Sequence, residues 1–399
     1  MSVEFVFVAA RRTPFGKFGA SFANLSATDL AVEASKACLS QSGLKGSDIG
    51  ASVFGNVIQS SPDAIYLARH VALKIGAGLE TPALTVNRLC GSGFEAIVQG
   101  AYLIQNNEAE CVLVGGAENM TQVPYVLRGA RFGYRMGNAE IEDALHTGLV
   151  DSYTGLPMAI TAENLAEKYN ISRAQVDAYA LRSQQGAAAA LSKGYFKDEI
   201  APVIIPSKKG ETRVEADEHP RPETTLEALE KLKSLFKKDG TVTAGTASGI
   251  VDGACALILT TRSFAEKKGL KILGTLKAWG SAGCDPNVMG IGPVPATHKA
   301  LKHYERLHGR AITVRDFKRV EVNEAFAAQY LAVEKELGLD PARTNVNGGA
   351  IAIGHPLAAS GARLTTHLLY DLKRLGGGLG LASACIGGGQ GMSLVVEVA

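Results

Sequence analysis

The sequence predicts an α/β fold built from two similar halves, with a mostly helical segment inserted into the chain between them. Short apolar stretches rich in β-branched residues alternate with longer amphipathic ones, the pattern of a mostly parallel sheet with helices on its faces. Between 121 and 249, charged helical patterns replace this alternation. Two segments near the C-terminus also repeat patterns of the first third of the chain. With 399 residues, 46% of them hydrophobic, the chain can bury two or three cores.

The first 120 residues contain several predicted strands and a well-delimited helix. Ser26 and Asp29 have the spacing of a capping box, and Gly43 supplies the stop signal of the helix between them. The strands are expected at 4–10, 51–58, 83–86 and 111–116. This part of the chain therefore forms the start of the first half.

The inserted segment and the second half are recognised by a change in sequence pattern, from alternating strands and helices to charged helices and back. Ser172 and Gln175 form a second capping box, and residues 208–225 are a polar excursion. The four lysines of this region are expected to be solvated: Lys208, Lys209, Lys237 and Lys238. Strand and helix patterns resume near 252. The predicted units are a first half of residues 1–120 plus 250–272, an inserted loop domain of 121–249, and a second half of 273–399.

The two halves share sequence patterns. "LTVNRLCGSG" at 84–93 and "TNVNGGAIAIGHP" at 344–356 each have a strand ending in Val-Asn, then a small-residue turn and a helix. "CVLVGGAENM" at 111–120 has a counterpart in "LASACIGGGQGM" at 381–392. An internal duplication would bring matching turns to one end of the strands, where open α/β folds bind their ligands.

Composition excludes several classes of function. Forty-one basic and thirty-nine acidic residues leave a formal charge of +2, without the long basic runs of nucleic-acid or membrane-surface binding. No apolar run reaches the roughly eighteen residues of a membrane span. The six cysteines lack CxxC spacing, so we expect no metal site and a reducing compartment. The N-terminus looks like a strand and turn, not a signal peptide, and the C-terminus carries no peroxisomal signal.

Cys90 lies where a strand gives way to a helix, between Arg88-Leu89 and a Gly-Ser-Gly turn. A thiol in the first turn of a helix would be favoured as thiolate, the nucleophilic form. Gly91 and Gly93 would let a substrate carbonyl approach the backbone, where the N–H of Cys90 can donate to an oxyanion. The alternative is a buried structural cysteine beside a close helix packing.

Three further segments carry candidate catalytic side chains, each with a plainer alternative. His355, between a glycine and Pro356, can project from a turn, or serve as a structural hydrogen-bonding group. Cys385 precedes three glycines, which suggests close backbone approach, although an ordinary tight turn has the same pattern. Asn323 follows a strand, where an asparagine also serves as a helix N-cap.

Together these segments resemble the thiolase family across essentially the whole chain. The matching motifs are "NRLCGSG", "GTVTAGTASGIVDGA", "MGIGPVPA", "VEVNEAFAAQ", "NVNGGAIAIGHPLAASGAR" and "SACIGGGQG". The resemblance implies a layered α-β-α-β-α fold of two duplicated halves. It also implies CoA-dependent thiolytic cleavage of 3-ketoacyl-CoA to acetyl-CoA and a shortened acyl-CoA, reversible as a Claisen condensation. Coenzyme A is then a co-substrate, and no permanently bound cofactor is expected.

The resemblance assigns a role to each matching residue. Cys90 would accept the acyl group as a thioester, and His355 would activate it. Cys385 would return a proton to the acetyl carbanion in thiolysis and remove the α-proton of acetyl-CoA in condensation. Asn323 would hold a water in one oxyanion hole beside His355. The backbone N–H groups of Cys90 and Gly387 would form the other.

The same resemblance places the CoA contacts on Arg221, Thr224 and Ser248, and the acyl pocket at Met289 and Phe326. From the residues alone, Arg221 is as well explained as a solvated loop charge, and Ser248 as a helix cap. The sequence has neither a Walker loop nor a complete GxGxxG motif after a strand.

Departures from the family pattern and the remaining alternatives concern specificity and setting. Thr246 stands where many relatives have asparagine, and Ala358 and Ala359 where they often have glycine, in what we expect to be loops beside the pocket.

Three alternative functions remain. The first is a thiolase specific for acetoacetyl-CoA, the second is a decarboxylating ketoacyl synthase with a Cys-His-His set, and the third is a silent acyl-CoA carrier. We expect a homodimer or tetramer, joined at the sheet edge of the first half. The mitochondrial matrix is the expected location, with Arg11 and Arg12 compatible with it, and the cytoplasm is the alternative.

Overall fold

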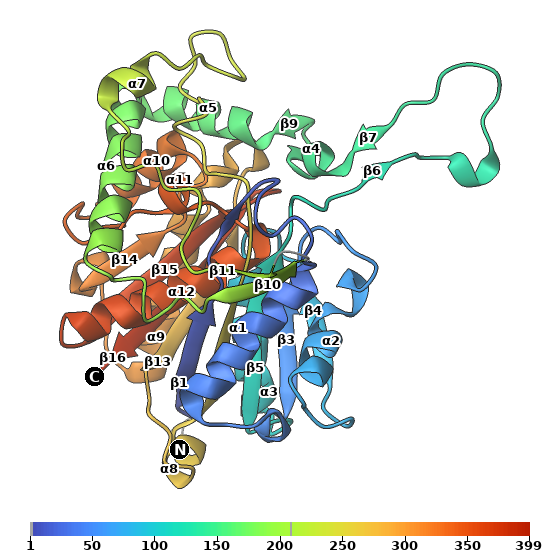
Figure 1. Cartoon of the computed structure of the whole chain (residues 1–399). Coiled ribbons are helices and arrows are strands. Elements are labelled where there is room, and N and C mark those ends of the chain that lie inside the picture. The colour runs from blue at the N-terminus through green and yellow to red at the C-terminus, as the bar shows by residue number, and fades with distance from the viewer. Residues whose placement is uncertain (1–2, 208–209) are drawn as a thin grey trace.

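The computed structural model describes residues 3–207 and 210–399, so the predicted Lys208–Lys209 pair lies outside the described residues. Its centre is one large sheet with the strand order β14-β15-β16-β13-β1-β12-β5-β3-β4, to which the short β2 (Gly16–Lys17) pairs through β12 (Figure 1). The two halves of this sheet meet where β1 pairs with β13 over three residues, Phe5–Phe7 against Gly274–Leu276. Because the junction is so short, each half of the sheet has two faces of its own, which helices cover.

The halves have the same strand order. From the outer edge to the junction, the order is β4-β3-β5-β12-β1 in the first half and β14-β15-β16-β13 in the second. In the second half the place of β4 is taken by Thr344, which forms a single bridge to the outer edge of β14. The expected duplication is therefore visible in the topology. The strands are β1 (Phe5–Arg12), β3 (Ala51–Gly55), β4 (Ala83–Val86), β5 (Cys111–Glu118), β12 (Val251–Thr261), β13 (Gly274–Gly283), β14 (Arg319–Val322), β15 (Gly378–Ile386) and β16 (Gln390–Val398).

The expectation of a mostly parallel sheet is wrong. Only β3 with β4, β3 with β5, and β14 with β15 pair in parallel, while every other pairing in the described sheet is antiparallel. The reason lies in the connections. β16 follows β15 directly through a three-glycine turn, and β12 follows the inserted segment. Neither β16 nor β12 therefore follows the right-handed helical crossover that would make it parallel to its neighbour.

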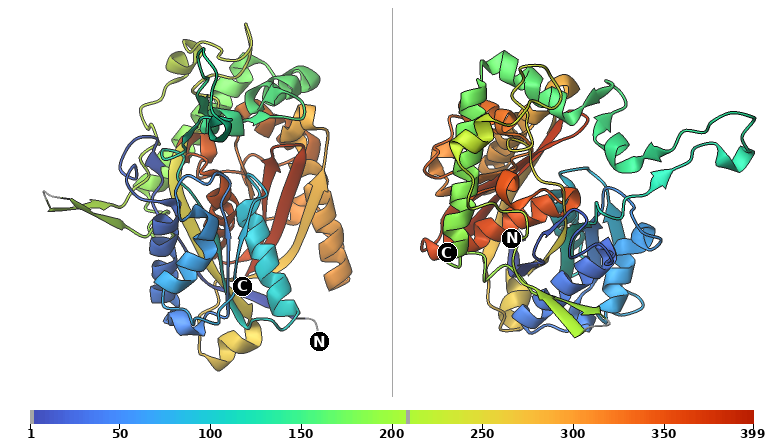
Figure 2. Two further views of the ribbon diagram at one scale, coloured as in Figure 1. Left: turned by 90° about the vertical axis from the view of Figure 1, so that its right-hand side faces the viewer. Right: turned by 45° about the horizontal axis from the view of Figure 1, so that its top comes forward.

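Helices cover both outer faces of the sheet and fill the space between its halves, giving the α-β-α-β-α layers (Figure 2). The capping boxes at Ser26–Asp29 and Ser172–Gln175 both form, and Gly43 ends its helix with φ 76°. The helices of the two halves are α1 (Ala27–Ser42), α2 (Leu67–Lys74), α3 (Ser92–Gln105), α8 (Arg262–Lys267), α9 (Pro293–His308), α10 (Ala327–Leu337), α11 (Ala350–Ile353) and α12 (Leu357–Arg374).

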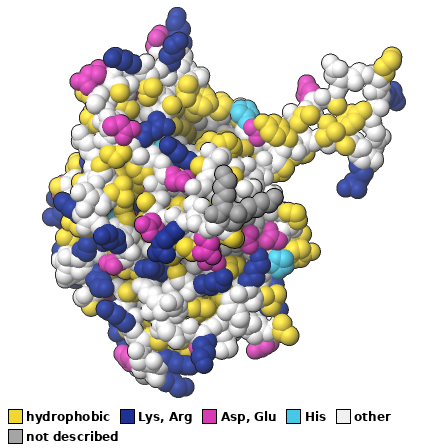
Figure 3. Space-filling model, in the orientation of Figure 1, with side chains coloured by type: hydrophobic (Ala, Val, Ile, Leu, Met, Phe, Trp, Pro, Cys, Tyr) yellow, Lys and Arg dark blue, Asp and Glu magenta, His cyan; other side chains and the backbone are white. Residues whose placement is uncertain are grey.

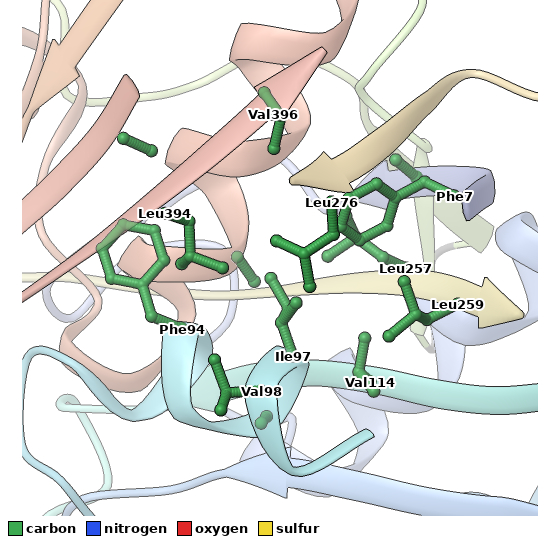
Figure 4. Close-up of a cluster of buried hydrophobic side chains, with 14 of the residues drawn as sticks. Phe7, Phe94, Ile97, Val98, Val114, Leu257, Leu259, Leu276, Leu394 and Val396 are labelled. Carbon is green, nitrogen blue, oxygen red and sulfur yellow. The ribbon is translucent and has the colours of Figure 1, made fainter. Parts of the chain in front are cut away.

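The central layer is the pair α3 and α12, and its core joins the two halves. Phe94 and Ile97 of α3 pack against Val114, Leu257 and Leu394 from strands of both halves (Figure 4). A fully buried Leu, Ile or Phe contributes about 1.5–3 kcal/mol to folding. Since α12 is buried from Leu357 to Leu372, the strand ends and helix starts around it are held firmly.

Among the described residues, the segment 121–249 adds no strand to the large sheet. Its helices α5 and α6 lie over one end of the second half, and β6 and β7 form an arm that projects from the body (Figure 1). Figure 3 shows apolar side chains along this arm and both signs of charge mixed over the visible face. The segment contains α4 (Ala144–Gly148), α5 (Met158–Tyr169), α6 (Arg173–Ser192), α7 (Leu226–Glu230), β6 (Tyr125–Val126), β7 (Glu142–Asp143), β8 (Val150–Asp151), β9 (Leu156–Pro157), β10 (Val203–Ser207) and β11 (Gly210–Val214).

The predicted polar excursion of 208–225 is partly built into the fold. Residues Gly210–Val214 form β11 of a hairpin, and Asp217 is buried against Arg12, which also binds Glu199 at 2.8 Å. Arg12 is therefore a structural ion-pair residue with no exposed surface. Within the part of the chain that the structure describes, no helix has the length and apolar character to cross a bilayer.

Candidate active site

Cys90 lies in a strained turn between β4 and α3. Leu89 has φ 47°, a left-handed conformation that is uncommon for a leucine, and α3 begins only at Ser92. The expected place in the first helical turn is therefore wrong by two residues. The glycines also have a different use: a Cβ on Gly91 would lie 2.4 Å from the Ile386 side chain, and one on Gly93 2.6 Å from the Ala362 nitrogen. They bring the second half up to Cys90.

The thiol of Cys90 is protonated in the resting protein. Burial raises the pKa of Cys90 to about 11, and the N–H groups of Gly387 and of Cys90 itself, which donate toward the sulfur, only partly oppose this. The idea that position alone favours thiolate is therefore wrong, because desolvation outweighs the helix start. Cys90 is partly exposed beside an apolar cluster with Leu357, and it needs a base.

His355 supplies a neutral imidazole. It lies in the turn between α11 and α12, where its Nδ1 is 2.5 Å from the Ser360 hydroxyl and its Nε2 is 3.4 Å from Nδ2 of Asn323. These contacts fit a proton on Nδ1 and a lone pair on Nε2. Burial lowers the pKa of His355 to about 3, with the Arg363 charge adding to the effect. Ser360 is a site residue that the motif comparison did not single out.

Asn323 follows β14 and is fully buried, with its backbone N–H donated to Ser383 at 2.8 Å. It is not a helix cap, because α10 begins at Ala327 and its N-cap residue is Phe326. The Oδ1 atom of Asn323 has no hydrogen-bond partner. A buried amide beside His355 with a free oxygen is suited to holding a water or a substrate oxygen.

Cys385 is fully buried at the end of β15, in a cluster with Met158, Met289 and Phe326. The two predicted acyl-pocket residues thus border this sulfur. Burial raises the pKa of Cys385 well above its usual value, and the neighbouring Cys90 raises it further. A Cβ on Gly387 would lie 3.1 Å from Leu89 and 3.4 Å from Met158, so the neighbours of the two cysteines meet at this glycine.

The glycines after Cys385 serve the turn and the site separately. Gly388 and Gly389 have φ 78° and 83°, so an ordinary tight turn explains both. Gly387 has no such conformation, and its N–H is the one directed at Cys90. Two backbone donors, from Gly387 and Cys90, therefore converge on one sulfur.

The predicted CoA contacts separate into two places. Ser248 donates its backbone N–H to Ala325 at 3.0 Å, next to the Asn323 segment, and no helix begins there for it to cap. Arg221 is exposed and its backbone N–H binds Gln184, while the Thr224 hydroxyl binds the Arg221 carbonyl at 2.8 Å. The structure does not bring these two side chains to the cysteines.

His219, which the sequence motifs did not single out, joins the loop of Arg221 to the centre of the protein. Its Nδ1 lies 2.9 Å from the Ala352 carbonyl, and a Cβ on Gly249 would meet its ring at 2.2 Å. Lys237, expected to be solvated, pairs with Glu167. The loop thus flanks the segment that leads to His355, whose N–H is donated to Gly249 at 2.9 Å.

Ala358 and Ala359, two departures from the family pattern, do not lie in a loop as expected. Ala358 and Ala359 are fully buried inside α12, where the Ala358 carbonyl packs on Gly116 and its N–H binds Glu118 at 3.1 Å. They are packing residues of the central layer and not loop residues. Thr246 is also buried, and its hydroxyl is donated to the Thr241 carbonyl at 2.9 Å.

Comparison with known proteins agrees with this arrangement. Residues 5–263 match the model of the thiolase N-terminal domain, and residues 270–398 match that of the thiolase C-terminal domain. The mitochondrial 3-ketoacyl-CoA thiolases of Bos taurus and Homo sapiens are each 52% identical over 391 residues, covering 98% of this chain and 97% of the relative. An acetyl-CoA acetyltransferase of Chromobacterium violaceum is 46% identical over 397 residues, 99% of this chain and 100% of the relative.

Solved structures show the same likeness. The crystal structure of human mitochondrial 3-ketoacyl-CoA thiolase superposes with a TM-score of 0.96 at 52% identity, covering 100% of this chain and 99% of that one. The structure of the human enzyme in complex with CoA gives a TM-score of 0.95 at the same identity, covering 100% and 98%. The chain belongs to the thiolase family.

Proposed function

We propose that the protein is a 3-ketoacyl-CoA thiolase, an acyltransferase that uses free CoA to cleave 3-ketoacyl-CoA into acetyl-CoA and a shortened acyl-CoA in fatty acid β-oxidation. The observation that carries the proposal is the convergence of turns from opposite halves on Cys90: Gly387, which follows Cys385, directs its N–H at this sulfur, and Leu357, which follows His355, belongs to the cluster beside it. The neutral imidazole of His355 in turn lies beside the amide of Asn323. The relatives named 3-ketoacyl-CoA thiolase, alike over nearly the full chain, support it.

In this proposal the chemistry is divided between the residues as follows. His355 takes the proton of Cys90, whose sulfur attacks the keto carbon and becomes acylated as the adjacent carbon–carbon bond breaks. Cys385 protonates the departing acetyl-CoA carbanion, and the thiol of free CoA then displaces the acyl group. The N–H groups of Cys90 and Gly387 stabilise one oxyanion, and Asn323 with His355 the other.

The inserted segment 121–249 is proposed to bind CoA through Arg221, Thr224 and Ser248, with the acyl chain against Met289 and Phe326. The loop of Arg221 is anchored by His219 beside the site, and an exposed guanidinium can reach a phosphate. The crystal structure of the human relative in complex with CoA supports CoA as the co-substrate.

Assembly and location follow as further proposals. The sheet edge at β4 has only partly buried residues, and the arm exposes Phe132 and Met136 almost completely, so both suit contact with another copy in a dimer or tetramer. Full-length relatives named as mitochondrial enzymes support the mitochondrial matrix.

The direct test is thiolysis of acetoacetyl-CoA by the reduced protein with free CoA, followed by loss of the enolate absorbance. We expect consumption that depends on both substrates; its absence would favour a silent acyl-CoA carrier. A short-chain acetoacetyl-CoA thiolase is the second candidate, supported by the acetyl-CoA acetyltransferase likeness. A rate profile over acyl chain lengths separates the two, because only the proposed enzyme keeps its rate on longer substrates. The ketoacyl synthase class is disfavoured, since an asparagine and not a second histidine lies beside His355.

A further inference from the structure

The buried central helix α12 carries a line of polar side chains that the proposed mechanism does not use. Ser360, Arg363, His367, Asp371 and Arg374 recur at intervals of three and four residues, so they share one face of the helix. We call this set the α12 polar seam. It begins beside His355 and runs to the far end of the helix.

All but one of the seam residues have hydrogen-bonded side-chain partners. Ser360 binds His355 at 2.5 Å, and His367 binds Glu199 at 2.8 Å and Asn347 at 3.0 Å. Lower in the seam, Asp371 accepts from Arg319 at 2.7 Å and from Arg374 at 2.9 Å. The pattern is that of a satisfied buried network.

Arg363 is the exception. The residue is about as buried as a core leucine, at 1% exposure, yet Nε, Nη1 and Nη2 all lack a hydrogen-bond partner among the described residues. Its counter-ion is Glu321, whose Oε2 lies 3.5 Å from Nη1 and also makes no hydrogen bond. Buried donors of a charged group are costly unless satisfied, so internal water is the natural partner here. A pair of hydrophobic side chains at this place would give a folded state at least as stable as this buried ion pair does.

The position of this pair relates it to the site. Glu321 and Asn323 are two residues apart in extended chain, so their side chains lie on the same face of the sheet, and Ser360 and Arg363 are one turn apart on α12. The Glu321–Arg363 pair is therefore the next layer below Asn323, His355 and Ser360. Arg363 and Asn323 thus lie in adjacent layers, and both carry buried polar atoms without a hydrogen-bond partner among the described residues.

We propose that Arg363 is a positioning residue of the thiolase reaction, which orients the amide of Asn323 through buried water and thereby fixes the Nε2 side of His355. The inference rests on the proposed function. Arg363 also acts on His355 through its charge, which disfavours a protonated imidazole. Burial raises the pKa of its partner Glu321 to about 7, and the charged groups that act on Glu321 are His367, Arg363, Asp371 and Glu324.

The test compares Arg363→Met and Arg363→Lys with a matched control, Arg374→Met, at the far end of the same seam. For Arg363→Met we expect kcat to fall by about 10²-fold through misplacement of the amide and imidazole, with little change in KM for acyl-CoA. The acid limb of kcat/KM should also move to higher pH, because the neutral imidazole loses its neighbouring cation. Arg363→Lys should recover part of kcat, and Arg374→Met should keep both kcat and the profile.

A double variant, Arg363→Met with Glu321→Gln, removes the possibility that the arginine only neutralises a buried carboxylate. We expect it to regain thermal stability while kcat and the pH profile stay changed. Wild-type kcat and an unshifted profile in the double variant would overturn the inference. Failure of the wild-type protein to cleave acetoacetyl-CoA would instead contradict the proposed function, so the two failures are distinguishable.

Discussion

The turns that carry Cys90 and Cys385 come from opposite halves and follow strands that are not counterparts, and their surroundings differ. Cys90 follows a left-handed Leu89, stands before a helix and is partly exposed, with two backbone N–H groups directed at it. Cys385 ends a strand, is fully buried and lies among Met158, Met289 and Phe326. One sulfur is thus partly exposed, and the other is enclosed by apolar side chains.

This contrast suits the roles that we propose for the two thiols, one as the nucleophile and the other as an acid. Burial raises the pKa of both cysteines, so neither is a resting thiolate. Access and partners separate them: Cys90 has donors suited to an oxyanion, whereas Cys385 keeps its proton in an apolar surrounding until a carbanion arrives. Substitutions can break or sharpen this difference.

Cys90→Ala should have the largest effect. Without the nucleophile, thiolysis of acetoacetyl-CoA should fall by about 10⁴-fold or more, measured from enolate absorbance. The matched control is Cys284→Ala, since Cys284 is another partly exposed cysteine near the same site, with its Sγ 3.8 Å from the Met289 carbonyl and close enough to Cys385 to raise the pKa of that thiol. Equal loss in both variants would contradict the difference in role.

Cys385→Ala should slow complete turnover by about 10²- to 10⁴-fold, the range of a lost general acid. Acylation by a simple thioester needs no proton on carbon, so its rate should change little. Stopped-flow measurement of acyl transfer from acetyl-CoA, set against steady-state thiolysis, checks this split. Parallel loss of both rates would mean that the buried sulfur does more than move a proton.

Asn323→Ala should reduce kcat by about 10²- to 10³-fold, because one oxyanion donor set is lost. The free Oδ1 atom and the absence of a capping contact predict little change in thermal unfolding. Calorimetry beside the kinetic assay tests this. A large drop in melting temperature would show a structural role in place of a catalytic one.

Ser360→Ala should have the smallest effect. The Nδ1 contact holds the tautomer of His355, and the loss of one hydrogen bond of about 1 kcal/mol corresponds to roughly a 5- to 10-fold lower kcat. Ser360→Thr is the matched variant that keeps the hydroxyl. Activity unchanged in Ser360→Ala would show that neighbouring packing alone orients the imidazole.

Local signals in the sequence predicted much of the fold because they act within a few residues. The Ser26–Asp29 box and the glycine at 43 determine a helix by short-range hydrogen bonds and φ. The direction of β12 was not predictable in this way, since it depends on where the inserted segment returns to the sheet. The direction of β16 does follow from a local signal, the glycine turn that joins it to β15.

The site shows the same limit. Motifs located Cys90, His355, Asn323 and Cys385, but the helix start at Ser92 and the raised pKa of Cys90 depend on contacts with the second half. The α12 polar seam has a helical period that the sequence displays. Its meaning appears only when Glu321 and Glu199 are seen to face it.

The most direct measurement is peptide-mapped mass spectrometry after incubation with acetyl-CoA in the absence of free CoA. A Cys90 acyl-enzyme predicts one acetyl group on the Cys90 peptide in the wild type and in Cys385→Ala, and none in Cys90→Ala. Acetylation of the Cys385 peptide, or an unchanged label in Cys90→Ala, would contradict the assignment of the nucleophile.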